Sequence, residues 1–368
     1  MNQRENPPLN TSPDSVIRAA GPECPIFDIR SPGERLQGSP GDAIPMSLEE
    51  LLQACEPGGE KPISCGFIIC GEGVRSLKAV KQLRKRGFTG FSSVTGGFKA
   101  WKAVGLPANY PDGLDASQAD RYARHLVMPQ VGPEGQQKLL RSRILLAGLG
   151  GLNSPVALYL AAAGVGTLGL VDFDRVERSN LQRQVIHGES GLGELKVESA
   201  KARLKDLNPD IQARIYDQHV TPDNADDIIE PWDIVVDGTD SFTSRYTLND
   251  ACIRQSKPLV YGAVMRFQGQ VSVFWPAYSS TETAPCFRCL MPREPSAGAA
   301  PGCAEAGVLG IMPGIVGTLQ AAEALKLALG IGQPLVGKLL MIDSLNMEFR
   351  KTGVTANPAC SSCGSKAP

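Results

Sequence analysis

The sequence lacks both long hydrophobic runs and an excess of charge of either sign. Its 37 lysines and arginines nearly balance its 38 aspartates and glutamates, giving a net charge of −1. Nothing in this balance favours nucleic acid or an anionic membrane as a partner. The longest apolar run falls well short of the roughly 18 residues of a transmembrane helix. The polar, proline-rich N-terminal segment does not resemble a secretory signal, so we expect a cytoplasmic protein.

The sequence also lacks internal repeats, and its 368 residues are many for one domain. The stretch from residue 107 to 117 contains two prolines and a glycine and has no periodicity, which is typical of a linker. We therefore predict two α/β domains, over residues 14–107 and 118–368, with a linker over 108–117. The second domain is predicted to begin with one continuous helix over 118–140.

A strand, glycine turn, helix and second strand follow one another in the most informative segment. Residues 144–147 predict a buried strand, Gly148, Gly150 and Gly151 predict a tight turn, and a second apolar run ends at Asp172. Glycines allow backbone N–H groups to approach phosphate at a helix N-terminus, and an acid at the end of the second strand can accept hydrogen bonds from a ribose. The segment therefore predicts a nucleotide site.

Two details of this segment argue against NAD as the nucleotide. Asn153 stands at the third glycine position of the dinucleotide fingerprint, where helix and strand pack closely, and we expect it to loosen nucleotide binding. A dense polar run over residues 173–184 follows Asp172. Within and after it, Asn180, Arg183 and Lys196 are suited to converge on a triphosphate. A solvated polar loop is the alternative interpretation of this run.

An apolar run in the first domain ends at a cysteine. Residues 67–69 predict a strand, Cys70 follows, and the loop over 71–76 precedes a helical stretch. Backbone N–H groups of such a loop, the helix dipole and Arg75 would lower the pKa of the thiol and stabilise a thiolate or a persulfide. A buried cysteine at a strand end, without chemistry, is the alternative.

A carboxylate pair follows another apolar run, over residues 232–237. Asp237 and Asp240 flank a turn at the C-terminal end of a predicted strand, where ligands bind in α/β sheets. Asp240 is placed to hold Mg²⁺ on the phosphates of ATP. The alternative is that Asp240 caps the following helix.

The chain contains ten cysteines, which in an intracellular protein are more often metal ligands or reactive thiols than disulfides. Two C-x-x-C pairs, Cys286 with Cys289 and Cys360 with Cys363, have the composition of a closed, structural Zn²⁺ site. Two separate redox dithiols are the alternative. Cys303 lies in a glycine-rich segment before a helix predicted over 315–329, and it is a candidate nucleophile.

The first domain resembles a single-domain rhodanese. The resemblance rests on residues 27–34, the Cys70 to Ser76 loop and residues 95–101. Two residues depart from the family pattern. Gly71 replaces the arginine that often follows the cysteine, and Glu72 adds a negative charge. We therefore expect free thiosulfate to be a poor sulfur donor.

The second domain resembles the ubiquitin-activating-enzyme-like adenylyltransferases of the MoeB/ThiF type, above all their molybdopterin-synthase adenylyltransferase/sulfurtransferase branch. The resemblance rests on residues 121–125, the glycine turn, residues 172–184, residues 196–200, residues 237–240, both cysteine pairs and residues 303–310. It implies a Rossmann-like adenylation domain with a structural zinc site, and an ATP site that draws on Gly151, Asp172, Ser179, Asn180, Leu181, Gln182, Arg183, Lys196, Asp240 and Ser241. It also implies a homodimer in which Arg124 reaches into the partner's site.

The two resemblances together imply one reaction sequence. ATP would adenylate the C-terminal Gly-Gly carboxylate of a ubiquitin-like sulfur carrier, with Arg183 and Mg²⁺ at Asp240 stabilising the phosphates. A persulfide on Cys70, loaded by a donor such as a cysteine desulfurase, would then form a thiocarboxylate, with Cys303 resolving or holding the acyl group. The small subunit of molybdopterin synthase is the expected carrier, and thiamine, tRNA-thiolation and siderophore carriers are alternatives. An NAD-dependent oxidoreductase and a non-catalytic binding scaffold are the alternatives of another class.

Overall fold

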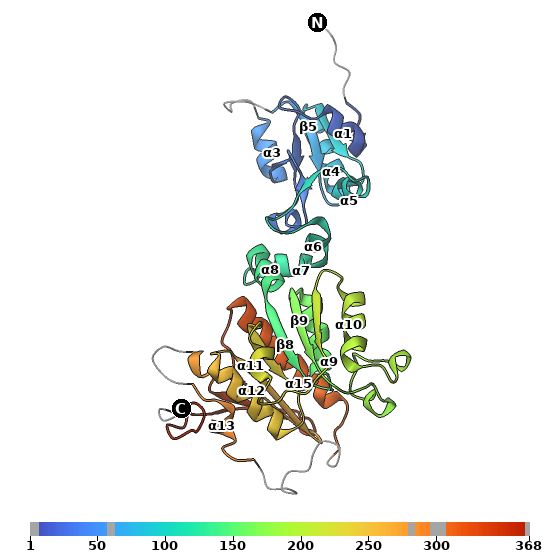
Figure 1. Ribbon diagram of the computed structural model, residues 1–368. Helices are drawn as coiled ribbons and strands as arrows, with labels where there is room; N and C mark the ends of the chain where they lie inside the picture. Colours follow the sequence, from blue (N-terminus) through green and yellow to red (C-terminus); the bar gives the residue numbers. More distant parts are fainter. Residues whose placement is uncertain (1–6, 57–62, 279–283, 295–306, 365–368) are drawn as a thin grey trace. The chain divides into compact units, whose positions relative to one another are not determined.

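The computed structural model describes residues 7–56, 63–278, 284–294 and 307–364. The chain forms two compact units, residues 1–136 and residues 137–368, and Figure 1 shows the elements of each. Among the described residues, no helix combines the length and the apolar character needed to cross a membrane. The predicted linker over 108–117 falls within the first unit.

The first unit is built on a five-stranded parallel sheet in the order β1-β6-β5-β2-β4. Its strands are β1 (Asn10–Thr11), β2 (Ile26–Asp28), β4 (Ile44–Pro45), β5 (Cys65–Ile69) and β6 (Gly90–Val94), and β3 (Ser39–Pro40) pairs separately with β7 (Ala108–Asn109). Its helices include α1 (Pro13–Ala19), α2 (Pro32–Arg35), α3 (Leu48–Ala54), α4 (Val74–Lys85) and α5 (Gly97–Ala103).

Both faces of this sheet are covered, as the apolar runs of its strands require. Neighbours in β5 point to opposite faces. Ile68 packs in a cluster with Leu83 of α4, whereas Ile69 packs in a second cluster with Val16 of α1 and Trp101 of α5. The sheet therefore has two small cores, and the C-terminal end of β5, where Cys70 lies, is held between them.

The single helix predicted over 118–140 is wrong. The segment forms three shorter helices, α6 (Ala116–Arg121), α7 (Ala123–Leu126) and α8 (Gly132–Arg141), and the boundary between the units falls within α8. Tyr122 leaves helical geometry at φ −96° and ψ 14°. Pro129 then precedes Gly132, which has a φ of +58° that side-chain-bearing residues rarely adopt.

The second unit is built on an eight-stranded mixed sheet in the order β10-β9-β8-β11-β12-β13-β14-β15. The parallel part comprises β8 (Arg143–Ala147), β9 (Thr167–Val171), β10 (Gln212–Tyr216), β11 (Ile234–Asp237) and β12 (Leu259–Met265). The antiparallel part adds β13 (Gln268–Phe274), β14 (Lys338–Asp343) and β15 (Glu348–Gly353).

Helices cover both faces of the parallel part. One layer contains α9 (Asn153–Ala163), α10 (Lys196–Leu207) and α15 (Ile311–Leu329), and the other contains α11 (Ala225–Ile229) and α12 (Phe242–Arg254). Val271 of β13 packs with Val316 of α15, whereas Phe274 packs with Ala251 of α12. Because Val271 and Phe274 are three residues apart, they face opposite sides of the sheet, which places the two layers on opposite faces. The remaining helix, α13 (Phe287–Leu290), is short.

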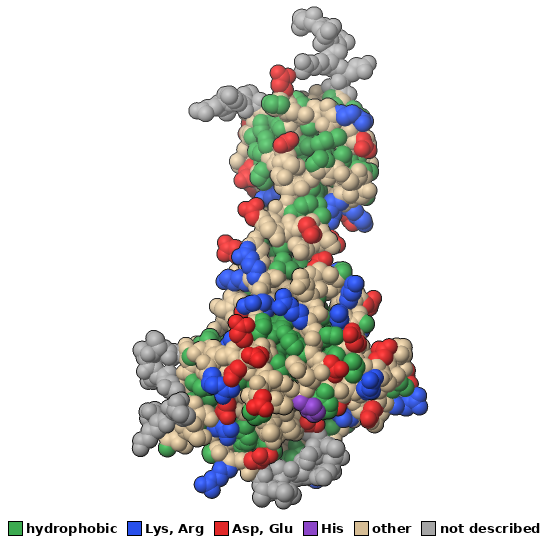
Figure 2. Space-filling model, in the orientation of Figure 1, with side chains coloured by type: hydrophobic (Ala, Val, Ile, Leu, Met, Phe, Trp, Pro, Cys, Tyr) green, Lys and Arg blue, Asp and Glu red, His purple; other side chains and the backbone are tan. Residues whose placement is uncertain are grey.

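Two local features of the second unit matter for the sites. Helix α15 begins at Ile311, a turn earlier than predicted, with Pro313 in its first turn, where the missing N–H has no helical partner to lose. The visible face of the unit carries both signs of charge interspersed rather than a patch of one sign, as Figure 2 shows.

Candidate functional site

The sequence of the first unit places Cys70 directly after β5, in a loop that leads into α4. The thiol is buried, and its Sγ accepts hydrogen bonds from the backbone N–H of Gly73 at 3.2 Å and of Ser76 at 3.3 Å. The hydroxyl of Ser76 lies 3.3 Å from the same sulfur. The N-cap of α4 is Gly73, whose φ of +87° turns the loop so that these N–H groups converge. The predicted anion-stabilising loop is therefore present.

The environment of Cys70 favours its thiolate. Burial raises the pKa of the thiol, but the hydrogen bonds from the Ser76 hydroxyl and from the backbone of Ser76, Gly73 and Glu72 outweigh it, so that the pKa is lowered. A lowered pKa makes a cysteine a better nucleophile at neutral pH. This argues against a cysteine that is merely buried at a strand end.

Arg75 pairs mainly with a carboxylate at the mouth of the loop. Its guanidinium donates to both oxygens of Glu34, and this hydrogen bonding lowers the pKa of Glu34 to about 2. Beside it, Lys99 lies 3.4 Å from a carboxylate oxygen of Glu72. Each cation at the mouth of the loop therefore faces an anion, which supports the expectation that a free dianion such as thiosulfate is attracted only weakly.

Asp28 and Arg30, which lie in the rhodanese-like motif over residues 27–34, form a buried ion pair. Arg30 donates to Asp28 at 2.6 Å and to the carbonyl oxygen of Gly38 at 2.7 Å, and its guanidinium lies over the ring of Phe98. Arg30 thus fixes the start of the segment that follows Gly38.

In the second unit, a cavity of about 280 Å³ opens at the C-terminal ends of the parallel strands. It is lined by five of the predicted ATP-binding residues, which come from five separate segments of the chain: Gly151, Asp172, Arg183, Lys196 and Asp240. The fold thus brings together residues that are far apart in the sequence.

The glycine turn and Asp172 are bonded to each other. One carboxylate oxygen of Asp172 accepts from the N–H of Leu149 at 2.7 Å, and the other accepts from the N–H of Asp174 at 2.8 Å. Gly148 has a φ of +80°, so the turn requires glycine there. Asp172 therefore fixes the turn against β9 as well as lining the cavity.

Charged groups of both signs surround the cavity. Lys196 is buried and donates to Asp174 at 2.8 Å, and Arg183 is half-buried and donates to the carbonyl oxygen of Ser179 at 3.1 Å. Asp240 is exposed. The side chain of Ser241, and not that of Asp240, caps α12, so the capping alternative for Asp240 is wrong. The arrangement can neutralise phosphates and offers a carboxylate for a divalent cation.

The structure places the other predicted ATP-binding residues outside the lining of this cavity. Ser179 and Asn180 belong to a short 3₁₀ helix over Arg178–Asn180, Leu181 and Gln182 follow it, and Ser241 lines a neighbouring cavity. Arg124 is exposed on α7 in the other unit. Cys303 lies outside the described residues. The roles of these residues stay predictions.

Three groups at the cavity were missed by sequence reasoning. Arg245 on α12 reaches back to donate to the carbonyl oxygens of Thr239 at 2.9 Å and Gly262 at 3.2 Å. Phe173 and His219, which follow different strands, stack their rings at the edge of the cavity. The position of Arg245, one turn into the helix after Asp240, was a local signal that could have identified it.

Asp237 has a structural role beside the cavity. It is fully buried, and one of its oxygens accepts from the N–H of Thr239 at 2.9 Å and from its hydroxyl at 2.7 Å. Burial raises its pKa, while the guanidinium of Arg245, 3.5 Å away, opposes the rise. Asp237 shapes the turn that presents Asp240.

A second cavity, of about 740 Å³, adjoins the first and shares Asp240, Arg245 and Val264 with it. It is lined by residues of β12, β13 and β14, including Tyr261 and Gln270. Its walls are mixed apolar and polar, and it reaches Asp240 from the antiparallel side of the sheet. A second substrate bound there would meet the nucleotide at Asp240 and Arg245.

The side chain of Asn153 fits into the close packing of helix and strand, and its expected effect on nucleotide binding stays a prediction. The side chain is fully buried and absent from the cavity lining, and its Nδ2 donates to the carbonyl oxygens of Gly148 at 2.8 Å and Ala147 at 3.0 Å. The space for it comes from Gly238, where a Cβ atom would lie 2.4 Å from Nδ2.

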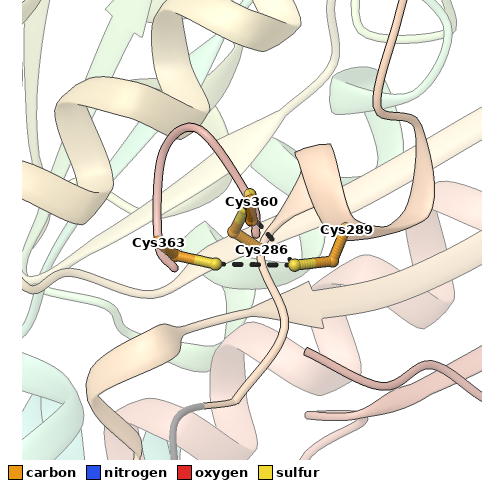
Figure 3. Close-up of side chains that lie close together, drawn as sticks. All are labelled: Cys286, Cys289, Cys360 and Cys363. Atoms are coloured by element: carbon orange, nitrogen blue, oxygen red, sulfur yellow. Dashed lines mark hydrogen bonds between the residues drawn. The ribbon is translucent and has the colours of Figure 1, made fainter. Parts of the chain in front are cut away.

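The four predicted metal-ligating cysteines converge, as Figure 3 shows. Their Sγ atoms all lie within 4.8 Å of one another, at 3.6 Å between Cys286 and Cys360 and 3.5 Å between Cys289 and Cys363. A tetrahedral zinc ion with Zn–S bonds near 2.3 Å requires S–S separations of about 3.8 Å. The cluster therefore fits zinc, whereas two separate redox dithiols would not meet in this way.

The residues between the paired cysteines fasten the cluster to α12. Arg288 donates to Asp250 at 2.7 Å, and the hydroxyl of Ser362 donates to the same carboxylate at 2.8 Å. The N–H of Phe287 donates to the side chain of Asn249 at 2.8 Å. The cluster thus holds the C-terminal segment against the helix that begins beside Asp240, which indicates a structural role.

Comparison with known proteins finds similarity for both units. A model of the ThiF family matches residues 122–362, and a model of the rhodanese-like domain matches residues 12–104. The sulfur carrier protein adenylyltransferase of Thermus thermophilus is 51% identical over 247 residues, which are 67% of this chain and 91% of that protein.

Two further similarities extend the comparison. The probable adenylyltransferase/sulfurtransferase MoeZ of Mycobacterium tuberculosis is 45% identical over 251 residues, covering 67% of this chain and 62% of MoeZ. The crystal structure of E. coli MccB with ATP matches with a TM-score of 0.56 and 21% identity. The matched region covers 73% of this chain and 85% of the MccB chain. That structural likeness concerns the fold alone.

Proposed function

Because the chain belongs to the ThiF family and also contains a rhodanese-like domain, we propose that it is an adenylyltransferase and sulfurtransferase that acts on a sulfur carrier protein. One observation carries the proposal: a single chain contains a cysteine in an anion-stabilising loop and a cavity with the cations and the carboxylate that phosphate chemistry needs. The substrate is the C-terminal Gly-Gly carboxylate of a ubiquitin-like sulfur carrier. The small subunit of molybdopterin synthase is our first candidate, and carriers of thiamine, tRNA-thiolation or siderophore pathways would undergo the same chemistry.

In the first step, the carrier carboxylate attacks the α-phosphorus of ATP and releases pyrophosphate, which leaves an acyl adenylate. The backbone of Gly151 and the side chains of Arg183 and Lys196 bind the phosphates, and Asp172 binds the ribose. Mg²⁺ on Asp240 would supply further charge neutralisation. Fixed cations are suited to this reaction because the phosphoryl oxygens gain charge in the transition state. The match to the ThiF family favours this chemistry over an NAD-dependent oxidation.

The second cavity is our proposed path for the carrier's C-terminal segment. It adjoins the nucleotide cavity at Asp240 and Arg245, and its volume of about 740 Å³ suits an extended peptide with small side chains. Two glycines at the end of the carrier would let its backbone approach the turn closely. The acyl group would then form beside Arg245.

In the second step, sulfur replaces AMP. Cys70 carries a persulfide taken from a persulfide donor such as a cysteine desulfurase, and its terminal sulfur attacks the acyl carbon and expels AMP. The product is an acyl disulfide. A second thiol, for which Cys303 is our candidate, attacks Sγ of Cys70, forms a disulfide with it and releases the carrier thiocarboxylate. An external dithiol then reduces that disulfide. The loop around Cys70 suits the persulfide because its N–H groups stabilise a sulfur anion.

Three further assignments complete the proposal. Zn²⁺ is the structural metal of the four-cysteine cluster, since the sulfur separations fit a tetrahedral site. The protein acts as a homodimer in which Arg124 of each protomer contributes to the partner's nucleotide site. It works in the cytoplasm, where no membrane or nucleic acid takes part.

The test is ATP–pyrophosphate exchange in the presence of a Gly-Gly-ended carrier. We expect exchange by the wild type, none by Asp240→Ala, and normal exchange by Cys70→Ala. Cys70→Ala should form no thiocarboxylate. Cys65→Ala is the control, because Cys65 lies in β5, the strand that precedes Cys70, and this variant should form thiocarboxylate at the wild-type rate. Absence of carrier-dependent exchange in the wild type would contradict the adenylation step. Normal thiocarboxylate formation by Cys70→Ala would contradict the sulfur step alone.

A further inference from the structure

The geometry points to Asn153 as a positioning residue that fixes the phosphate-binding turn relative to the turn that carries Asp240. This inference rests on the proposed ATP site, although Asn153 itself does not line that cavity. It concerns how two turns that bind one nucleotide are kept in a fixed relation.

The amide of Asn153 connects two neighbouring strands. Its Nδ2 donates at 3.0 Å to Ala147, which ends β8, and at 2.8 Å to Gly148, which begins the glycine turn. The carbonyl oxygen of Val236 in β11 lies 3.4 Å from the same nitrogen. Since β8 and β11 are adjacent and parallel, the amide lies between the backbones just before they separate into their turns. One side chain therefore links both turns.

The glycine at position 238 makes room for this link. A Cβ atom at Gly238 would lie 2.4 Å from Nδ2 of Asn153, closer than any side chain allows. The turn that leads to Asp240 is thus shaped around the amide. The two residues, far apart in the sequence, are complementary in shape.

A second amide holds the same turn on the side of β12, whereas Asn153 holds it on the side of β8. Gln320 on α15 is fully buried. Its Nε2 donates to the backbone carbonyl oxygens of Asp237 at 2.8 Å and of Val260 in β12 at 3.2 Å. Gly262 leaves space for it, because a Cβ atom there would lie 2.3 Å from Gln320. The end of β11 is thereby held between Asn153 and Gln320, and the helices that carry them, α9 and α15, pack together.

Removal of the Asn153 amide would take a donor from the carbonyl oxygens of Ala147 and Gly148. The N–H of Gly238 still donates to Ala147 at 2.9 Å, so the two turns would be held together more loosely rather than set free. A nucleotide that binds to both turns would then have to order them at binding, which lowers its affinity. Asn153→Asp has nearly the same size but presents an acceptor to three carbonyl oxygens. Its effect should therefore exceed that of Asn153→Ala.

The experiment measures ATP affinity by calorimetry, and KM and kcat in carrier-dependent pyrophosphate exchange, for full-length Asn153→Ala and Asn153→Asp. Asn208→Ala is the matched control, because Asn208 is also fully buried in the same unit and donates to a carbonyl oxygen, that of Ala161, at 2.7 Å. We expect Asn153→Ala to weaken ATP binding about tenfold, and Asn153→Asp to weaken it more strongly. The loss of Tm in Asn153→Ala should be similar to that in Asn208→Ala. Asn208→Ala should leave ATP affinity unchanged.

A double-mutant cycle separates positioning from general destabilisation. In an Asp240→Ala background, Asn153→Ala should change ATP affinity much less than in the wild type, because one of the two linked turns has already lost its contact. Equal ATP affinity of Asn153→Ala and wild type, an equal loss in Asn208→Ala, or full additivity with Asp240→Ala would overturn the inference. A wild type that binds ATP without exchanging pyrophosphate would instead count against the proposed function and leave the affinity comparison valid.

Discussion

Substitution of Ser76 by alanine tests whether the loop around Cys70 stabilises a thiolate. The Ser76 hydroxyl lies 3.3 Å from Sγ of Cys70, 3.1 Å from the carbonyl oxygen of Gly73 and 2.8 Å from the hydroxyl of Ser93. A hydroxyl has one proton, so donation to the thiolate requires release of Gly73. The hydroxyl of Ser93 can then donate to Ser76 and keep it oriented. Ser76→Ala removes this donor while the backbone N–H donors of Ser76, Gly73 and Glu72 remain.

The size of the effect follows from the number of donors lost. A hydrogen bond to a charged group contributes about 1.5–3 kcal/mol when it is buried, and one pKa unit corresponds to about 1.4 kcal/mol. Ser76 and Gly73 still offer their N–H groups, which limits the loss. Because the change destabilises the charged form by roughly the lower end of this range, the pKa of Cys70 should rise. At pH values below the titration the thiolate fraction should therefore fall about tenfold.

The assay is the rate of Cys70 alkylation by iodoacetamide against pH, followed on the Cys70 peptide by mass spectrometry in the full chain. We expect the midpoint to move to higher pH in Ser76→Ala, with the same rate as the wild type at the alkaline limit. Ser92→Ala is the control, because Ser92 is equally buried in β6 but bonds to Thr11 and the carbonyl oxygen of Pro8. An unchanged midpoint in Ser76→Ala, or an equal shift in Ser92→Ala, would refute this account of the loop.

Further predictions concern the loop mouth, the metal and the nucleotide. Glu34→Gln keeps the cap of α2 but removes a charge beside the loop, so kcat/KM for thiosulfate should rise about tenfold. Glu50→Gln, the same change in the matching cap of α3, should leave it unchanged, and equal values for both variants would count against the charge argument. Cys289→Ser should lower the zinc content and the Tm of the second unit in calorimetry, and full zinc content at an unchanged Tm would argue against the site. Lys196→Ala leaves Asp174 without its cation and should weaken ATP binding at least tenfold by calorimetry, whereas unchanged affinity would exclude Lys196 from the phosphate site.

Local patterns in the sequence predicted the elements that carry the chemistry. The strand before Cys70, the glycine turn after β8 and the strand before Asp240 are each defined by a few neighbouring residues, and each lies where predicted. The convergence of the four cysteines was equally predictable, because two closely spaced pairs are a pattern that needs little knowledge of the fold.

Features that depend on distant segments were not predictable. The position of Arg245 was a local signal, but its contact with Gly262 on another strand was not predictable, and Phe173 stacks on His219 only because β9 and β10 are neighbours. The packing of Asn153 depends on a distant segment in the same way. Viewed along the sequence, Asn153 replaces a glycine at a close contact, but in the fold its space is supplied by Gly238.

The breaks in the segment over 116–141 have a different cause. Pro129 and Gly132 are local signals in the sequence that the prediction of a single helix did not take into account, and the structure gives Gly132 a positive φ. A proline followed closely by a glycine is better interpreted as the end of one helix and the start of another.

The central claim is that one chain both adenylates a carrier tail and delivers sulfur to it. The most direct measurement is the intact mass of a Gly-Gly-ended carrier after incubation with the full-length protein, MgATP, a persulfide donor and a dithiol. The account predicts a mass increase equal to the exchange of one oxygen for sulfur with the wild type, and none with Asp240→Ala or Cys70→Ala. A carrier that keeps its original mass with the wild type, or gains sulfur with Cys70→Ala, would contradict it.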